Sequence, residues 1–115
     1  MKRKKCILLL PVTYNDGTEV PPSVLADILQ SIEEAFDGYT IDGPPCTGVY
    51  KMKDGSKARD TSIKVWVAVL PERVEEARML AARFAGVLKQ ESLYFEVTEA
   101  EVEFVRPLSE IGEKP

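Results

Sequence analysis

The chain has 115 residues, close to the commonest size of a single domain, and is long enough to bury a core of its own. Hydrophobic residues at 44% and charged residues at 30% are ordinary for a soluble globular protein, and no apolar run approaches the roughly 20 residues of a membrane helix. The formal net charge of -4 argues against general affinity for nucleic acid. A soluble protein with no membrane segment is therefore expected.

Cysteine and histidine usage narrows the chemistry. The two cysteines, Cys6 and Cys46, lack metal-site spacing, and a chain of this size needs no disulfide, so a reduced, cytoplasmic setting is expected. Histidine is absent, which removes the commonest general base and the commonest transition-metal ligand. Burial in an apolar run raises the pKa of the Cys6 thiol, and no histidine activates Cys46. No cofactor and no metal are expected.

The first two predicted elements are a buried strand and an amphipathic helix. Residues 6–12 form a continuous apolar run of strand length, which is typical of a central strand. From Pro21 onward, apolar residues recur at helical spacing while acidic residues take the other face. Gly38 ends this helix.

A long hairpin is predicted next. A strand that starts at 39–41 is interrupted over 42–45, because proline cannot donate to a sheet. Strand-like segments over 47–53 and 56–70 then flank Asp54-Gly55, one of the strongest signals for a two-residue turn. That turn pairs Tyr50 with Arg59, Val49 with Asp60 and Thr47 with Ser62.

The last part of the chain predicts a second helix, from Pro71, a strand over 93–97 and a further extended piece over 101–105. Strand, helix, two strands, helix, strand is the order of an α+β ferredoxin-like βαββαβ sandwich, an antiparallel sheet with two helices on one face. We expect a single domain over 1–106 and a flexible C-terminal tail over 107–115.

Alternation along the strands assigns side chains to the two faces of this sheet. Ile63, Val65, Val67 and Val69 share the helix-covered face, together with the apolar residues of the last strand. The open face then carries Asp60, Ser62, Lys64, Trp66, Tyr94 and Glu96. Aromatic residues on an open sheet favour a subunit interface, and a small-molecule pocket between subunits is the alternative.

Four acidic residues near the ends of these elements complete the candidate chemistry. Glu91 lies between the second helix and the last strand, where a carboxylate is far more often solvated or hydrogen-bonded to the backbone; a position near Asp60 or Lys64, reached by closure of the sheet, is the alternative. The alternating Glu99, Glu101 and Glu103 are better explained by a solvated edge strand than by a metal site. No catalytic signature stands out, so enzymatic activity stays open and a non-enzymatic protein is favoured.

The hairpin also carries a basic run that consists of Lys51, Lys53, Lys57 and Arg59. Proteins that recognise RNA share the βαββαβ order and stack bases on aromatic side chains of the open face. Neither central strand contains their aromatic signature, so nucleic-acid binding by this basic hairpin is the third hypothesis.

Two resemblances add to this interpretation. Residues 63–72, 93–97 and 101–106 resemble strands of the nitrogen-regulatory P-II signal proteins and their trimeric relatives, which implies ligands in clefts between subunits and a signalling loop over 42–62. The segment 89–92 departs from their glycine-rich phosphate loop, so no nucleotide site is implied.

The second resemblance is to small uncharacterised bacterial proteins of ferredoxin-like fold. It rests on Gly38-Tyr39-Thr40, Gly48-Val49-Tyr50, Asp54-Gly55, Ser62-x-Lys64 and Gln90-Glu91-Ser92. It implies that Ser62, Lys64, Gln90 and Glu91 act together.

Two functional hypotheses lead. The first is a non-enzymatic regulatory or protein-interaction module that works as a homo-oligomer, dimer or trimer, through its open face and the 42–62 loop. The second is a small-molecule sensor or cofactor-independent enzyme of the dimeric α+β barrel type, in which two open faces enclose a pocket.

Overall fold

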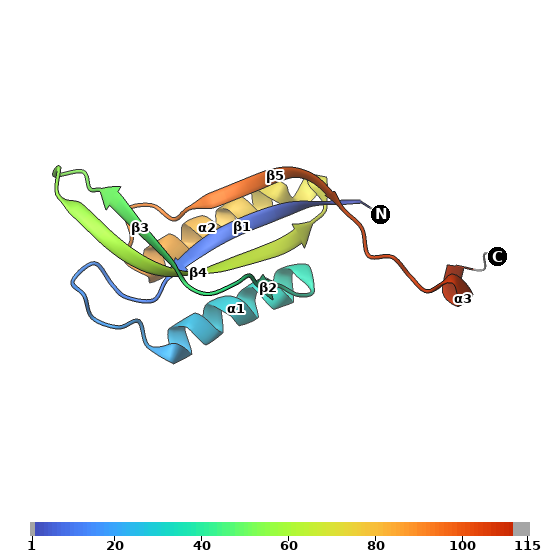
Figure 1. The fold of residues 1–115 in the computed structure, drawn as a ribbon, viewed down its shortest axis with the longest axis horizontal. Coiled ribbons are helices and arrows are strands. Elements are labelled where there is room, and N and C mark those ends of the chain that lie inside the picture. The colour runs from blue at the N-terminus through green and yellow to red at the C-terminus, as the bar shows by residue number, and fades with distance from the viewer. Residues whose placement is uncertain (1, 112–115) are drawn as a thin grey trace.

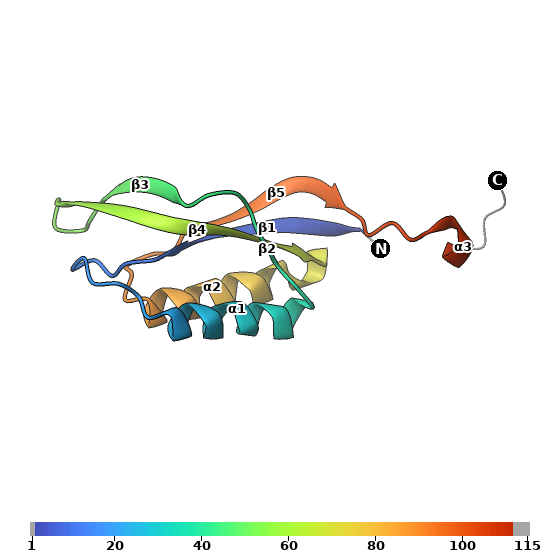
Figure 2. The ribbon, with the colours of Figure 1, turned by 60° about the horizontal axis from the view of Figure 1, so that its bottom comes forward.

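The computed structural model describes residues 2–111 and has the predicted ferredoxin-like α+β fold. A five-stranded antiparallel sheet carries the two long helices on one face, and its other face is open (Figure 1, Figure 2). The elements are β1 (Arg3–Pro11), α1 (Pro22–Phe36), β2 (Thr40–Ile41), β3 (Cys46–Lys51), β4 (Lys57–Val69), a 3-10 turn (Pro71–Arg73), α2 (Val74–Val87), β5 (Phe95–Val102) and α3 (Leu108–Ile111).

The sheet has β1 at its centre, between β4 and β5. The second strand of the fold is divided into β2 and β3, which both pair with β4. The division falls at residues 42–45, as predicted, because Pro44 and Pro45 have no backbone N–H to donate. Asp42 is still anchored, since its backbone N–H donates to the carbonyl oxygen of Lys64 at 2.9 Å.

The hydrophobic core lies between the sheet and the two helices. The apolar run of β1 supplies every second side chain to it, and β4 does the same with its valines, as the alternation predicted. Both helices turn an apolar stripe toward the sheet. The fully buried side chains include Cys6, Leu10, Val65, Val69, Ile32 and Leu88.

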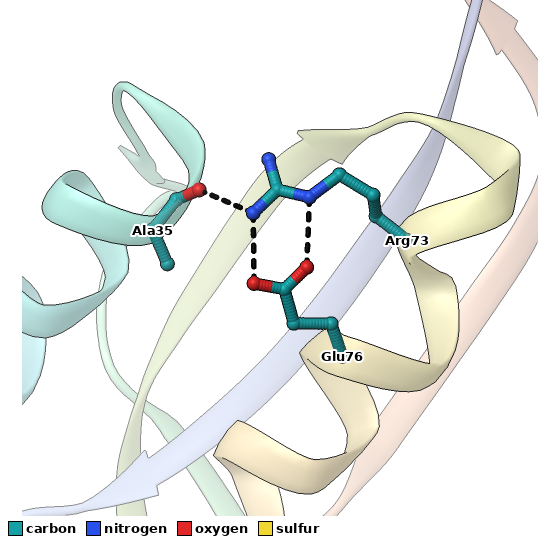
Figure 3. Close-up of polar contacts among 3 residues, drawn as sticks. All are labelled: Ala35, Arg73 and Glu76. Atoms are coloured by element: carbon teal, nitrogen blue, oxygen red, sulfur yellow. Dashed lines mark hydrogen bonds and ion pairs between the residues drawn. The ribbon is translucent and has the colours of Figure 1, made fainter.

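A polar contact joins the two helices at the outer edge of this layer (Figure 3). The guanidinium of Arg73 donates to both carboxylate oxygens of Glu76 at 2.8 Å, and Nη2 also donates to the carbonyl oxygen of Ala35 at 2.8 Å. That carbonyl belongs to the last turn of α1, where backbone acceptors lack a partner within the helix. Arg73 also lies over the Phe36 ring, 4.7 Å from its centroid. The contact therefore fixes the end of α1 against the start of α2.

The predicted register of the hairpin is wrong by one residue. Met52 N–H donates to the carbonyl oxygen of Ser56 at 2.7 Å, and Gly55 N–H donates to that of Met52 at 3.0 Å. The loop therefore has three residues and ends on Gly55 at φ +89°, a conformation that glycine adopts easily. Val49 consequently lies opposite Arg59, and Thr47 lies opposite Thr61. A slip of one residue exchanges the faces of all β3 side chains.

The end of the chain differs from its prediction in one respect. A single strand, β5, continues from Phe95 to Val102, in place of a strand over 93–97 and a separate piece over 101–105. An irregularity between Arg3 and Lys5 shifts its pairing with β1. The four-residue α3 follows and lies away from the body (Figure 2). Residues 112–115 of the predicted tail lie outside the described residues, and the division at 106 stays a prediction.

Candidate functional site

A pocket of about 170 Å³ lies on the open face, where β1 ends, β4 begins and the α2–β5 loop passes over the sheet. Its floor is formed by side chains of β1 and β4, and its walls come from the hairpin and from that loop. The lining residues are Leu9, Pro11, Tyr50, Lys51, Met52, Ala58, Asp60, Ser62, Gln90, Glu91, Ser92, Leu93 and Tyr94. We call this the Asp60 pocket.

Asp60 is the polar residue that sets the character of the pocket. It is only 7% exposed, and Ser62, two residues along the same face of β4, is 4% exposed. Burial raises the pKa of Asp60, and among the described residues no neighbouring charge or hydrogen bond counteracts this effect. Because desolvation disfavours the charged form of a carboxylate that has no partner, a group of this kind in a pocket is a candidate for a functional site.

Tyr50 borders the pocket because of the three-residue hairpin loop. In the observed register Gly48 lies opposite Asp60 and Tyr50 lies opposite Ala58, so both face the open side. The Tyr50 ring lies over Gly48: a Cβ atom at position 48 would be 2.8 Å from the Tyr50 hydroxyl oxygen. Glycine at position 48 therefore leaves the space that the tyrosine ring occupies beside Asp60.

The α2–β5 loop is held over the pocket by backbone geometry. Lys89 adopts φ +56°, and Gln90 N–H donates to the carbonyl oxygen of Ala85 at 2.9 Å, which ends α2 with a left-handed residue. The Glu91 carboxylate then accepts a hydrogen bond from the backbone N–H of Lys53 at 3.3 Å. This contact connects the loop to the tip of the hairpin, so two segments distant in sequence border one pocket.

The predicted site residues fall into two groups. Asp60, Ser62, Gln90, Glu91 and Tyr94 line the Asp60 pocket, whereas Lys64, Trp66 and Glu96 lie further along the open face. Glu91 and Asp60 border the same pocket, and the Glu91 carboxylate also accepts a backbone hydrogen bond, which is the more common role of a carboxylate at such a junction. Lys64 forms its ion pair with Asp42, at 3.7 Å between Nζ and Oδ2.

Tyr94 and Glu96 form a polar pair at the edge of the open face. The Tyr94 hydroxyl donates to Glu96 Oε1 at 2.5 Å, and the Thr98 hydroxyl donates to Oε2 at 3.1 Å. The bond to Tyr94 is the main reason why the pKa of Glu96 lies below its usual range, and the same bond raises the pKa of Tyr94. Lys64 and Lys5 lower the pKa of Glu96 further.

The remaining candidates lie outside the pocket or at its rim. Lys53, Lys57 and Arg59 are exposed on the hairpin, and Lys51 is exposed at the pocket rim. Cys6 is buried with a raised thiol pKa, and neither cysteine is in a disulfide. Within residues 2–111 no group of three or more acidic or cysteine side chains is placed to hold a metal ion. No described helix is long and apolar enough to span a membrane.

Tyr50, Leu9 and Pro11 are site residues that sequence reasoning missed. Leu9 and Pro11 were part of an apolar run that predicted burial on both faces. Tyr50 was assigned to the wrong face by the two-residue turn. The signal that would have found it is the pair Gly48 and Tyr50, because a glycine beside a large aromatic residue on one strand face indicates close packing.

Fold and pocket together define a ferredoxin-like α+β domain with a small polar pocket on its open sheet face. No family model and no curated protein sequence matches the chain. Two solved structures of a phage SAM lyase share the fold with a TM-score of 0.64. The complex with S-methyl-5'-thioadenosine is 12% identical, with 90% of each chain covered, and the apo form is 15% identical, with 84% of this chain and 80% of that chain covered.

The divalent cation tolerance protein Cut A1 from Thermus thermophilus is also similar. It is 13% identical, with a TM-score of 0.54, and the alignment covers 96% of this chain and 91% of that chain. Identities this low show a shared fold and no more. The likeness agrees with the predicted ferredoxin-like α+β fold, and membership of a sequence family is not established by it.

Proposed function

We propose that this protein binds a small, positively charged molecule in the Asp60 pocket and works as a homo-oligomer, as a sensor or as a cofactor-independent enzyme. The observation that carries the proposal is the Asp60 carboxyl group, 7% exposed and without a compensating neighbour among the described residues. A cationic ligand supplies the missing partner. It turns a costly buried carboxylate into a charge-assisted contact.

The walls of the pocket support the same ligand class. Tyr50 and Tyr94 supply aromatic rings, on whose faces cations are attracted by the ring quadrupole. Glu91 adds a second carboxylate, and Ser62 adds a hydroxyl that either donates or accepts. Lys51 is the one cation among the described lining residues, and it is exposed.

Pocket size supports a homo-oligomer. A volume of about 170 Å³ is below the roughly 300 to 1,000 Å³ of typical small-molecule sites. The open face around it presents Tyr94 at 47% exposure and Tyr50 at 39%. A second copy on this face encloses the pocket and covers these side chains, so interface and ligand site are one region. A reduced cytoplasmic setting completes the proposal.

The phage SAM lyase provides a specific ligand to test. That enzyme shares only the fold with this chain, and its structure in complex with S-methyl-5'-thioadenosine is the reason for choosing this class of ligand. SAM is a sulfonium cation that also carries an amino-acid chain, and its neutral thioether counterpart is S-adenosylhomocysteine, which keeps that chain and lacks only the methyl group and the positive charge on sulfur. The two ligands therefore form a matched pair for a site whose recognition depends on positive charge.

The test is isothermal titration calorimetry with both ligands on the wild-type protein, Asp60→Asn and Asp27→Asn, an exposed control on α1. We expect SAM to bind more tightly than the thioether and Asp60→Asn to lose SAM affinity by about tenfold or more, which is about 1.4 kcal/mol. Asp27→Asn is expected to match the wild type. Equal affinity for the two ligands, or an unchanged Asp60→Asn, contradicts the cation site.

Native mass spectrometry of the same samples distinguishes two hypotheses for this protein: an interaction module without a ligand, and an oligomer that binds a ligand. A dimer or trimer with bound SAM supports the full proposal. An oligomer that binds neither ligand, in which Lys64→Ala abolishes assembly, supports the regulatory interaction module. A monomer at every concentration contradicts the covered open face.

A further inference from the structure

A second pocket, of about 380 Å³, lies at the opposite end of the open face. The strand register places it there, because Arg3 and Trp66 lie at the ends of β1 and β4 that are remote from Asp60. Phe104, which follows β5, and Tyr39, which precedes β2, close its sides. We call this the Arg3 pocket. Its volume is within the range of small-molecule sites, roughly 300 to 1,000 Å³.

Arg3 gives this pocket a cation without a fixed partner. Its Nε is buried and has no hydrogen-bond partner among the described residues. Its guanidinium carbon lies 5.7 Å from the centroid of the Phe104 ring, and no ion pair to Arg3 occurs within residues 2–111. The Arg3 guanidinium is thus incompletely paired within the described chain and lines the pocket, so the site favours a ligand that accepts hydrogen bonds from it.

The charges around Arg3 favour an anion. Lys5 Nζ lies 4.8 Å from the centroid of the Trp66 ring, so a second cation borders the same end of the sheet. Asp37 is the one carboxylate among the described lining residues. Asp37 also interacts with Arg73 and helps to raise the pKa of that arginine. The negative charge of Asp37 is therefore partly balanced by Arg73, which does not line the pocket.

Aromatic rings provide the rest of the surface. Trp66, Tyr39 and Phe104 come from three different segments of the chain, and Tyr39 and Phe104 are 38% and 67% exposed. Flat rings on several sides of one pocket fit a flat ligand, which stacks on them with little loss of rotational freedom. The planar guanidinium of arginine matches a carboxylate, because two parallel N–H groups face its two oxygens.

We propose that the Arg3 pocket binds a small aromatic carboxylate. Its carboxylate accepts hydrogen bonds from the Arg3 guanidinium, and its ring lies among Trp66, Tyr39 and Phe104. The inference does not rest on the Asp60 pocket, which favours the opposite charge and lies at the other end of the sheet. One open face then carries two sites of complementary chemistry.

Trp66 makes the test direct, because it is the one tryptophan of the sequence and lines the pocket. Its fluorescence is measured while benzoate, neutral benzamide and cationic benzylamine are added separately. We expect a saturable change with benzoate, at least about tenfold weaker binding of benzamide, equivalent to about 1.4 kcal/mol, and no saturable change with benzylamine. Ligand-observed NMR checks that each fluorescence change reports binding.

Three arginine variants test whether Arg3 causes the preference for benzoate over benzamide. Arg3→Met is expected to remove the preference for benzoate over benzamide, Arg3→Lys to keep part of it, and Arg83→Met, an exposed control on α2, to leave it intact. Equal binding of benzoate and benzamide to the wild type overturns the proposal without any variant. An absence of benzoate binding also overturns it, as does an unchanged preference in folded Arg3→Met. A fluorescence change that depends only on protein concentration assigns the pocket to a second copy instead and equally overturns it.

Discussion

The two faces of the sheet are made by the same strands and have opposite roles. On the covered face, β1 contributes Cys6, Leu8 and Leu10, which are at most 4% exposed and pack against the helices. On the open face, the alternate residues of the same strand are Lys5, Ile7 and Leu9. Ile7 lies opposite Trp66 and Leu9 lies opposite Lys64. The backbone N–H of Leu9 also donates to the carbonyl oxygen of Tyr94. Alternation with a period of two thus separates a face that stabilises the fold from a face that carries chemistry.

The open face is further divided between its two ends. The Asp60 pocket combines two carboxylates with tyrosine rings, whereas the Arg3 pocket combines a guanidinium with a tryptophan. The covered-face positions that pack against the helices are apolar, because water is excluded there. Side chains on the open face are less constrained by packing, so their chemistry can differ from one end to the other.

Truncation of one leucine on each face gives the largest expected difference. Leu10→Ala removes a fully buried side chain from the core, so we expect the free energy of unfolding to fall by about 2 to 5 kcal/mol. Leu9→Ala truncates a half-buried side chain in the Asp60 pocket and is expected to cost about 1 kcal/mol. Urea unfolding followed by circular dichroism measures both. Equal losses would mean that the open face is as well packed as the core.

Removal of the Asp60 charge is expected to have the next largest effect on the free energy of unfolding. Unlike the leucine truncations, it is expected to raise this free energy. Asp60 has a raised pKa in the folded chain, so the folded state disfavours its ionised form. The contribution of Asp60 to stability is therefore fully present below the unfolded pKa, about 3.9, and is lost as the pH rises through the raised folded pKa. We expect Asp60→Asn to be more stable than the wild type at pH 7 by about 1 kcal/mol.

The pH dependence of that gain identifies its cause. The advantage of Asp60→Asn should shrink as the pH falls, because protonated aspartic acid and asparagine are both neutral. Asp27→Asn, on the exposed face of α1, serves as the control and should show no such gain. A gain that is the same at pH 3 and pH 7 would point to packing. A loss of stability at pH 7 would show that the Asp60 carboxylate is paired in solution.

Much of the fold follows from pattern alone. The apolar run of β1, the helical spacing of α1 and the glycine at position 38 each predict one feature, and the structure contains all of them. Asp54-Gly55 correctly predicted a hairpin. These features are local, because each depends on the backbone preferences of a few neighbouring residues or on one period of hydrophobicity.

The site was less predictable because it depends on register and on contacts between distant segments. Two-residue and three-residue loops are both compatible with Asp54-Gly55, and the choice decides whether Tyr50 lies beside Asp60 or on the other face. Phe104 and Arg3 lie at opposite ends of the sequence, and no local pattern relates them. Asp60, by contrast, was identifiable, since alternation along one strand is enough to place it on the open face.

The smallest expected effect on stability comes from the hydrogen bond between Tyr94 and Glu96. This pair is exposed, so it provides the comparison with the buried Asp60 carboxyl group. Tyr94→Phe removes the hydroxyl that lowers the pKa of Glu96 most, so that pKa should rise toward its ordinary value. The bond from Thr98 and the charges of Lys64 and Lys5 remain, so part of the lowering should persist. Carboxyl carbon NMR titration measures the change, with Tyr14→Phe as the control. Because Tyr94 is exposed, the thermal midpoint should move less than in either of the preceding variants, and an unchanged Glu96 titration would contradict the bond in solution.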